Sequence, residues 1–206
     1  MRFSLTILLL CAASVITLAG RAENSTQPNV LLIISDDQSW GDYSFLGHPH
    51  IKTPHLDKLA GESLTYTRGY VAAPLCRPSL ASIFSGRHPH EHGITGNDPR
   101  IQSGKRAGRT NPELAPLYDA IMDRIDDEPG LAHLLGRAGY LSLQTGKWWE
   151  GDPKKRGGFT HAMTHGDPKR GGRHGDAGLK ISRQGIKPIT DFIDEAGKKK
   201  KPFFIW

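Results

Sequence analysis

Short apolar runs alternate along this chain with segments whose apolar residues recur at helical spacing. The run at residues 29–34 (NVLLII) is continuous and too short for a typical helix, which suits a strand covered on both faces. Residues 54–61 have proline in the first turn and apolar residues at helical spacing, so we expect a helix, followed by a strand at 64–70. Residues 78–85 repeat the helix signature, and Gly86 follows as a stop.

The second half of the chain continues this alternation around two irregular stretches. Residues 97–129 and 151–178 are polar or rich in glycine and basic residues, and we expect both to be irregular excursions. The other expected elements are a helical piece at 117–125, a helix at 131–138, a strand at 140–144, a helix at 186–196 and a strand at 203–206. This order predicts an α/β domain with a largely parallel central sheet and helices on both faces.

The first 22 residues have the pattern of an export signal. Arg2 gives a basic start, an apolar stretch covers residues 5–18, and Gly20 and Ala22 have the spacing of a peptidase site. The apolar stretch is short for a transmembrane helix. We therefore expect a signal peptide at 1–22, a mature domain at 23–206, export to the periplasm or the extracellular space, and no stable membrane anchor.

The last four residues form an apolar run without a turn or polar tail after it. A strand that ended there would leave an unprotected apolar edge. We therefore expect residues 23–206 to be the N-terminal part of a longer, apparently truncated domain.

The charge and cysteine content of the chain argue against a nucleic-acid partner and against an internal disulfide. The chain has 27 Lys and Arg against 21 Asp and Glu, a net charge of +6, and loss of Arg2 and Arg21 with the signal would leave +4. That excess matches the lysine run at 198–201, and no groove-reading motif accompanies it, so we expect no nucleic-acid partner. Cys76 would be the only cysteine after signal cleavage, which excludes an internal disulfide.

Two acidic residues follow the first expected strand. Asp36 and Asp37 lie where that strand gives way to loop, and in open α/β sheets this carboxyl edge is where ligands bind. Two carboxylates there form part of a cage for a hard divalent cation such as Ca²⁺. Asp42 is either a third oxygen ligand or a hydrogen-bond acceptor that fixes the loop, and we favour the second role.

Cys76 lies just before the helix expected at 78–85. A group at a helix N-terminus faces unsatisfied N–H donors and the positive end of the helix dipole, which favours a reactive thiol and an anionic substrate. Lys147 follows Gly146 at the end of the strand expected at 140–144.

Four sequence blocks in this order resemble the sulfatase family, which belongs to the alkaline-phosphatase-like superfamily. The blocks are NVLLIISDD at 29–37, TPHLD at 53–57, CRPS at 76–79 with Ser85-Gly86 after it, and the segment from Gly139-Tyr140 to Gly146-Lys147. The resemblance implies an alkaline-phosphatase-like fold of which this chain holds the first part.

The resemblance also implies chemistry for individual residues. Asp36, Asp37 and Cys76 would hold Ca²⁺, or Mg²⁺, and a maturation enzyme would convert Cys76 to formylglycine. In the family, one hydroxyl of the hydrated aldehyde attacks sulfur and the other helps to expel sulfate. Lys147 would bind the sulfate oxygens as charge develops.

Two positions depart from the family pattern. Leu80 stands where the family usually has an arginine that supports maturation, and Trp149 stands where it usually has a histidine. Trp149 could provide an aromatic wall against a sugar ring or pack against the sheet. The missing donor could be replaced by a basic residue after Cys76, and the candidates are Arg77, Arg87, His88, His90 and His92.

These observations predict an exported sulfuric ester hydrolase. Its substrate would be a sulfated small molecule or a sulfated glycan. Two alternatives are a phosphoester or phosphonate hydrolase of the same superfamily, and a degenerate homologue that binds sulfated glycans without catalysis.

Overall fold

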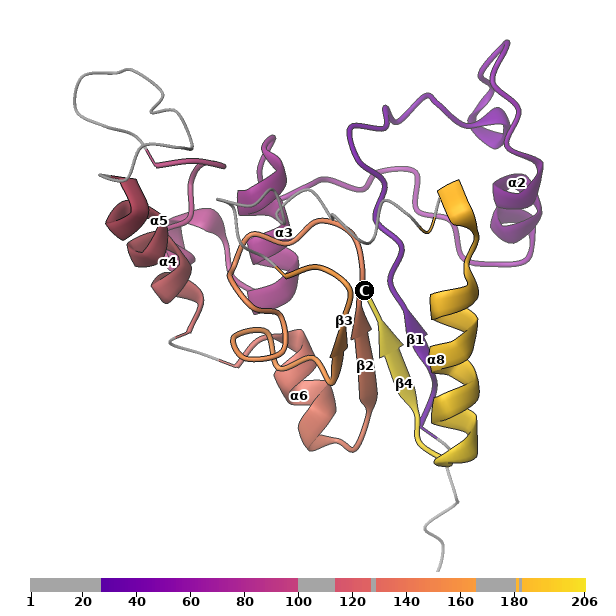
Figure 1. The fold of residues 1–206 in the computed structure, drawn as a ribbon. Helices are drawn as coiled ribbons and strands as arrows, with labels where there is room; N and C mark the ends of the chain where they lie inside the picture. Colours follow the sequence, from indigo (N-terminus) through magenta and orange to yellow (C-terminus); the bar gives the residue numbers. More distant parts are fainter. Residues whose placement is uncertain (1–26, 100–113, 127–128, 166–180, 182) are drawn as a thin grey trace, which may run out of the picture.

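The computed structural model describes residues 27–99, 114–126, 129–165, 181 and 183–206. Its centre is a four-stranded sheet in the order β1-β4-β2-β3. The strands are β1 (Val30–Leu31), β2 (Leu141–Gln144), β3 (His161–Ala162) and β4 (Phe203–Ile205). All three strand pairs are parallel, so the carboxyl ends of the strands lie at one edge of the sheet (Figure 1).

Helices surround this sheet and lead into its loops. They are the 3₁₀ helices η1 (Ser44–Leu46) and η3 (Asp123–Ile125) and the α-helices α2 (Pro54–Gly61), α3 (Cys76–Ser85), α4 (Pro89–His92), α5 (Ala115–Met122), α6 (Leu131–Arg137) and α8 (Lys187–Lys198). Helix α3 begins at Cys76, two residues before the start expected from the sequence, and ends where Gly86 takes the left-handed conformation (φ 72°).

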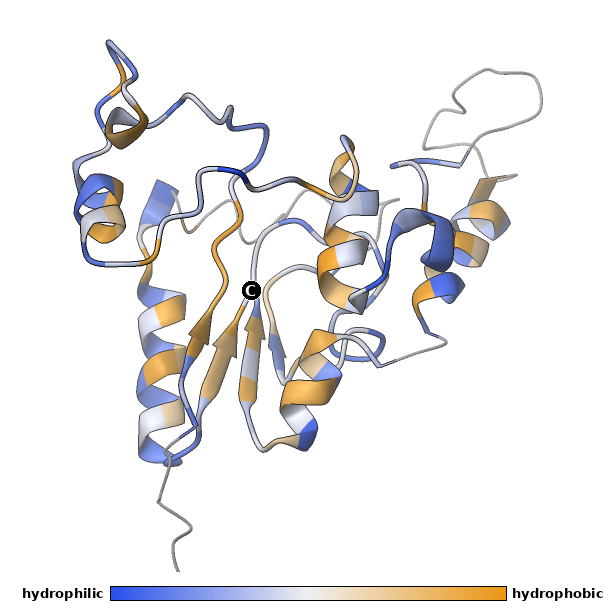
Figure 2. Cartoon of the chain, turned by 180° about the vertical axis from the view of Figure 1, so that it is seen from behind, coloured by the Kyte–Doolittle hydropathy of each residue, from blue (hydrophilic) through white to orange (hydrophobic). Residues whose placement is uncertain are grey.

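The core lies on both faces of the sheet. Phe204 of β4 belongs to a cluster with Phe84 of α3 and Ala132 of α6. Its neighbour Ile205 belongs to a second cluster with Phe192 of α8. Successive strand residues point to opposite faces, so α3 and α6 cover one face and α8 covers the other. In Figure 2 the strands β1 and β4 between these helices are largely orange, the colour of apolar residues. The expected α/β fold with a parallel sheet and helices on both faces is confirmed.

Two expected strands differ from the structure. The run at 29–34 pairs as a strand only at Val30–Leu31, and Ile33 beyond it is 79% exposed rather than covered on both faces. The segment at 64–70 contains no strand, and its side chains Leu64, Tyr66 and Tyr70 are exposed. An apolar alternation forms a strand only where it pairs with a neighbouring strand, and none of the described strands pairs with this segment.

The two irregular stretches contain more structure than expected. The helical piece at 117–125 is confirmed as α5 and η3, but Tyr118, Met122 and Ile125 are buried rather than at the surface. Strand β3 lies within the second stretch and was not expected. The signal peptide expected at 1–22 and residues 166–178 of the second stretch lie outside the described residues.

Within the part of the chain that the structure describes, no helix combines the length and apolar character needed to cross a membrane.

Candidate active site

Residues from three distant segments meet at the carboxyl edge of the sheet. Asp36 follows β1, Cys76 begins α3, and Lys147 follows the turn after β2. The Lys147 Nζ atom lies 2.7 Å from Asp36 Oδ1 and 3.6 Å from Cys76 Sγ. The Cys76 Sγ atom is in turn 3.8 Å from Asp36 Oδ1. The fold therefore brings together an acid, a thiol and an ammonium group that the sequence separates by up to 111 residues.

The carboxylates of this cluster form a partial cage for a cation. Asp36, Asp37 and Cys76 each offer one ligand atom, and these atoms lie within 4.8 Å of one another. Asp37 has a left-handed backbone (φ 52°), which aspartate tolerates better than most residues. Both acids are exposed, so a hard cation could reach them.

The cluster opens into a cavity of about 910 Å³. Asp36, Asp37, Cys76 and Lys147 lie on its wall, together with apolar side chains from β1, from the segment before α3 and from α8. Lys147 is the only cation among the described residues that line it. Leu80, at the position where the family pattern has arginine, lines the same cavity.

A buried hydrogen-bond network shapes the turn that carries Lys147. Gln144, fully buried at the end of β2, donates from Nε2 to the carbonyl oxygens of Thr145 (3.0 Å) and Gly146 (3.1 Å). The Thr164 hydroxyl also donates to the Gly146 oxygen (2.7 Å). Gly146 has φ 71°, a conformation that glycine adopts without strain. These hydrogen bonds fix the turn from which the Lys147 side chain extends.

The environment of Lys147 keeps it charged. Partial burial alone would lower its pKa, but the hydrogen bond to Asp36 and the electrostatic interactions with Cys76 and Asp36 raise the pKa above its ordinary value. The Nζ atom also lies 5.7 Å from the ring centroid of Trp149, within range of a cation–π contact. Trp149 is only 3% exposed, so its ring contacts Lys147 but does not present a broad surface against which a sugar could stack.

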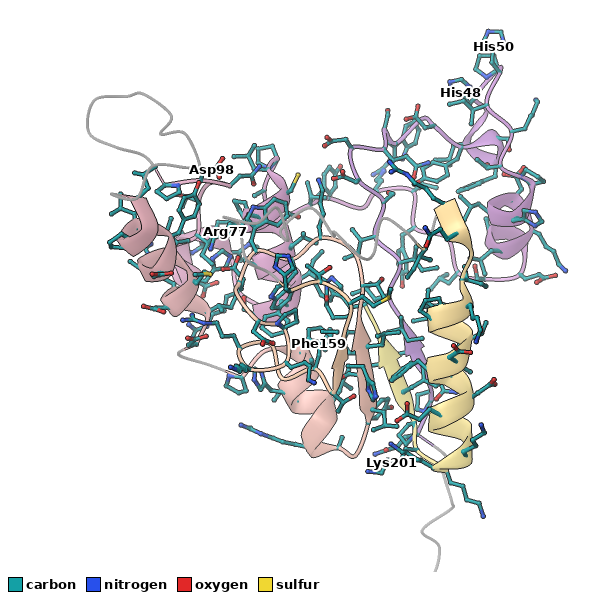
Figure 3. The ribbon with its side chains drawn as sticks, in the orientation of Figure 1. His48, His50, Arg77, Asp98, Phe159 and Lys201 are labelled. Carbon is teal, nitrogen blue, oxygen red and sulfur yellow. The ribbon has the colours of Figure 1, made fainter. Side chains whose placement is uncertain are left out.

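Arg77 does not point into the cavity. Its side chain is 1% exposed, and its guanidinium donates from Nε to Glu150 Oε1 (2.8 Å) and from Nη2 to Glu150 Oε2 (2.7 Å). Figure 3 labels Arg77 beside α3, far from His48 and His50 at the tip of the loop before α2. The structure therefore does not support the expected contact between Arg77 and the substrate, because the pair with Glu150 occupies its charge.

The other candidate donors also lie away from the cavity wall. His92 is buried, and its Nε2 is 3.0 Å from Ser82 Oγ while its Nδ1 accepts the N–H of Ile94. His88 and His90 stack on each other at 5.8 Å. None of these histidines lines the cavity, and neither does Arg87.

Asp42 has the loop-fixing role that we favoured. Its Oδ2 atom accepts the N–H of Ser39 at 2.9 Å. It is not part of the cluster of potential metal ligands found among the described residues.

Sequence reasoning missed the residues that hold this site in place. Glu150, Gln144 and Asn97 accept or donate hydrogen bonds around it. Glu150 and Asn97 lie outside the four family blocks, and Gln144 lies inside one without a role assigned to it. The one local signal was an acid directly after two tryptophans at 148–149, since an acid in such apolar surroundings requires a cationic partner.

The sequence profile of the sulfatase family matches residues 28–206. This chain belongs to the sulfatase family. The N-acetylgalactosamine-6-sulfatase of Homo sapiens is 36% identical over 140 residues, which are 68% of this chain and 24% of that protein. The chain thus spans about a quarter of the length of this curated relative.

Solved structures agree with this assignment. The crystal structure of Ps i-CgsB has 26% sequence identity and a TM-score of 0.61, with 87% of this chain and 44% of that chain covered. The same protein in complex with k-i-k-neocarrahexaose has 25% identity and a TM-score of 0.59 over the same shares of the two chains.

Proposed function

We propose that this chain is the N-terminal part of an exported sulfatase that cleaves sulfate esters, with Cys76 as the precursor of a formylglycine nucleophile. The observation that carries the proposal is the meeting of Asp36, Asp37, Cys76 and Lys147 at the mouth of one cavity. Family membership adds the reaction class to this geometry.

The donor set fits a hard divalent cation, Ca²⁺ or Mg²⁺. Asp36 and Asp37 supply carboxylate oxygens, and Cys76 Sγ marks the place that an oxygen of formylglycine would take. A cation bound there would polarise the sulfate and favour ionisation of the attacking hydroxyl. Further ligands would have to come from outside the residues described, because three groups do not complete the six to eight that Ca²⁺ takes.

The residues of this chain contribute orientation and charge. Lys147 would hold a sulfate oxygen with the ammonium that now bonds Asp36. Helix α3 directs its N-terminus, and hence its positive dipole end, at the same point. The anionic sulfate would therefore meet positive potential from two directions.

The substrate class that we propose is a sulfated glycan or a smaller sulfated molecule. The cavity is large enough for a sugar unit, and apolar side chains such as Ile33 and Val71 line it beside the charged cluster. The relative named for N-acetylgalactosamine-6-sulfate and the neighbour solved with a carrahexaose both favour a glycan.

Mass spectrometry of the protein from its native host tests the nucleophile. Trypsin releases residues 69–87 as one peptide, because the bond between Arg77 and Pro78 resists cleavage. We expect formylglycine in place of Cys76, and we expect Cys76→Ala to abolish turnover of an aryl sulfate. An unmodified cysteine throughout would contradict the proposal and favour a binding protein without catalysis.

Two further measurements test the reaction and the export. The complete protein should hydrolyse an aryl sulfate faster than the matching aryl phosphate, and the reverse order would indicate a phosphoester hydrolase. We propose that a maturation enzyme acts on Cys76 and that the signal peptide is removed after Ala22. N-terminal sequencing should then begin at Glu23, and a mature protein that retained Met1 would contradict export by this route.

A further inference from the structure

Arg77 and Glu150 form a buried ion pair beside the reactive cluster. Their side chains are 1% and 5% exposed, and two parallel N–H···O bonds of 2.8 Å and 2.7 Å join them. Such a two-point contact fixes distance and orientation together, which a single hydrogen bond does not. It joins the two segments that carry Cys76 and Lys147 and lies within three residues of each.

The loop after β2 is attached to α3 near both ends of that helix. Trp148 follows Lys147 directly and packs edge-on against Phe84 of α3, with ring centroids 5.0 Å apart. Glu150 then bonds Arg77 at the other end of the same helix. The loop is therefore held to α3 at two points, and a rigid connection of this kind determines where Lys147 lies relative to Cys76.

The start of α3 has a second anchor that acts on Arg77 alone. Leu75, the residue before the helix, makes no side-chain cap hydrogen bond. The backbone N–H of Arg77 instead donates to Asn97 Oδ1 at 2.9 Å. Arg77 is thus fixed through its main chain and its side chain, and Cys76 is its immediate neighbour.

The energetics of this pair favour a geometric role over a stabilising one. Removing two charges from water has a large desolvation cost, and buried ion pairs can often be replaced by apolar residues without loss of stability. The Arg77 Nη1 atom is also buried without a hydrogen-bond partner among the described residues. The hydrogen bonds of the pair therefore do not fully offset the free energy of desolvation. An apolar pair would pack here as well but would not define one orientation.

We propose that the Arg77–Glu150 pair is a positioning device that holds the residue-76 side chain opposite Lys147, and that Arg77 acts through this pair and not on the substrate. The proposal rests on the proposed function only for its kinetic readout. The distance that we propose the pair maintains is the 3.6 Å between Cys76 Sγ and Lys147 Nζ.

The test uses the complete protein with three changes. Arg77→Met with Glu150→Met removes both charges at similar volume and should leave the urea midpoint of unfolding close to that of the original protein. Arg77→Lys keeps the charge but loses the two-point contact. Lys187→Met is the matched control, because it breaks the exposed ion pair between Lys187 and Asp191 at the start of α8.

The first readout needs no turnover. In protein expressed without the maturation enzyme, a short iodoacetyl–succinimidyl reagent can bridge the Cys76 thiol and the Lys147 amine, since its spacer is about as long as their separation. We expect the yield of this cross-link, measured by mass spectrometry, to fall about tenfold in the double variant and in Arg77→Lys, and to stay unchanged in Lys187→Met.

The second readout is steady-state hydrolysis of an aryl sulfate by the matured protein. We expect kcat of the double variant to fall about 10- to 100-fold while KM changes less than about threefold, because misplacement of reacting groups affects the transition state most. An unchanged cross-link yield and kcat in a stably folded double variant would overturn the proposal. If the original protein hydrolyses no sulfate ester, the proposed function fails, and the cross-link still decides whether the pair positions Cys76.

Discussion

Gly130→Ala tests the packing that joins α3 to the loop carrying Lys147. Gly130 is buried just before α6, and its φ of −77° is open to any residue. A Cβ atom there would lie 2.0 Å from Cε1 and 2.2 Å from Cζ of Phe84. Non-bonded carbon atoms pack at about 3.5–4.0 Å, so the ring or α6 would have to move by about 1.5 Å.

The Phe84 ring has little room to move. Trp148, Phe159 and Trp206 surround it at centroid distances of 5.0, 6.3 and 6.4 Å. Overpacking of a tight core costs about 1–3 kcal/mol, so we expect Gly130→Ala to lower the free energy of unfolding by about 2 kcal/mol. For a chain of this size that corresponds to a fall in Tm of about 4–8 °C.

The assay is urea and thermal unfolding followed by circular dichroism, with Gly130→Ser as the matched control. Serine carries the same Cβ but is a better helix N-cap than alanine or glycine. If the clash dominates, both variants lose stability, whereas if capping dominates, Gly130→Ser is at least as stable as the original. A Phe84→Leu background should reduce the cost of Gly130→Ala by about 1 kcal/mol, because it frees space at the clash. Full stability of both Gly130 variants would refute the reasoning.

Three other changes test the site and its support. Burial lowers the pKa of His92, so the folded protein resists its protonation: stability should fall as pH decreases below about 6.5, and His92→Gln should flatten that dependence in urea titrations at several pH values. Asp37→Asn should weaken Ca²⁺ binding at least about tenfold by calorimetry, whereas Asp42→Asn should leave the affinity unchanged. An equal loss of affinity in both variants would show that Asp42 is also a calcium ligand. Lys147→Met should lower kcat of the complete protein by about 100-fold or more, and a loss confined to KM would show that Lys147 binds the ground state only.

Much of the site could be predicted from the sequence because its residues stand at the ends of recognisable elements. Asp36 and Asp37 follow an apolar run, Cys76 precedes a proline-started helix, and Lys147 follows a glycine at a strand end. In a parallel sheet these ends meet at one edge, and the structure places all four side chains there. Local pattern and topology singled out Asp36, Asp37 and Cys76, and the family resemblance added Lys147.

The partners of these residues could not be predicted in the same way. Arg77 appeared to be a free basic residue next to the thiol, and only the fold shows that Glu150, 73 residues later, takes up its charge. Strand β3 has two residues and forms because β2 presents an edge to it, which no local periodicity reveals. The alternation at 64–70 predicted a strand, but strand formation depends on a partner rather than on the segment itself.

The position of β1 has a consequence for how a cation would act on the protein. Only Val30 and Leu31 pair with β4, the Leu32 N–H adds one bond to Ile205, and no described residue pairs with the outer edge. A short edge strand is among the first elements to exchange its amide hydrogens by local opening. A ligand that binds only the ordered form, at 100 times its Kd, would oppose that opening by about 2.7 kcal/mol. Calcium bound to Asp36 and Asp37 would therefore stabilise β1, the strand that leads to these two ligands. The rate of amide exchange in β1 would then report whether the calcium site is occupied, before any substrate is present.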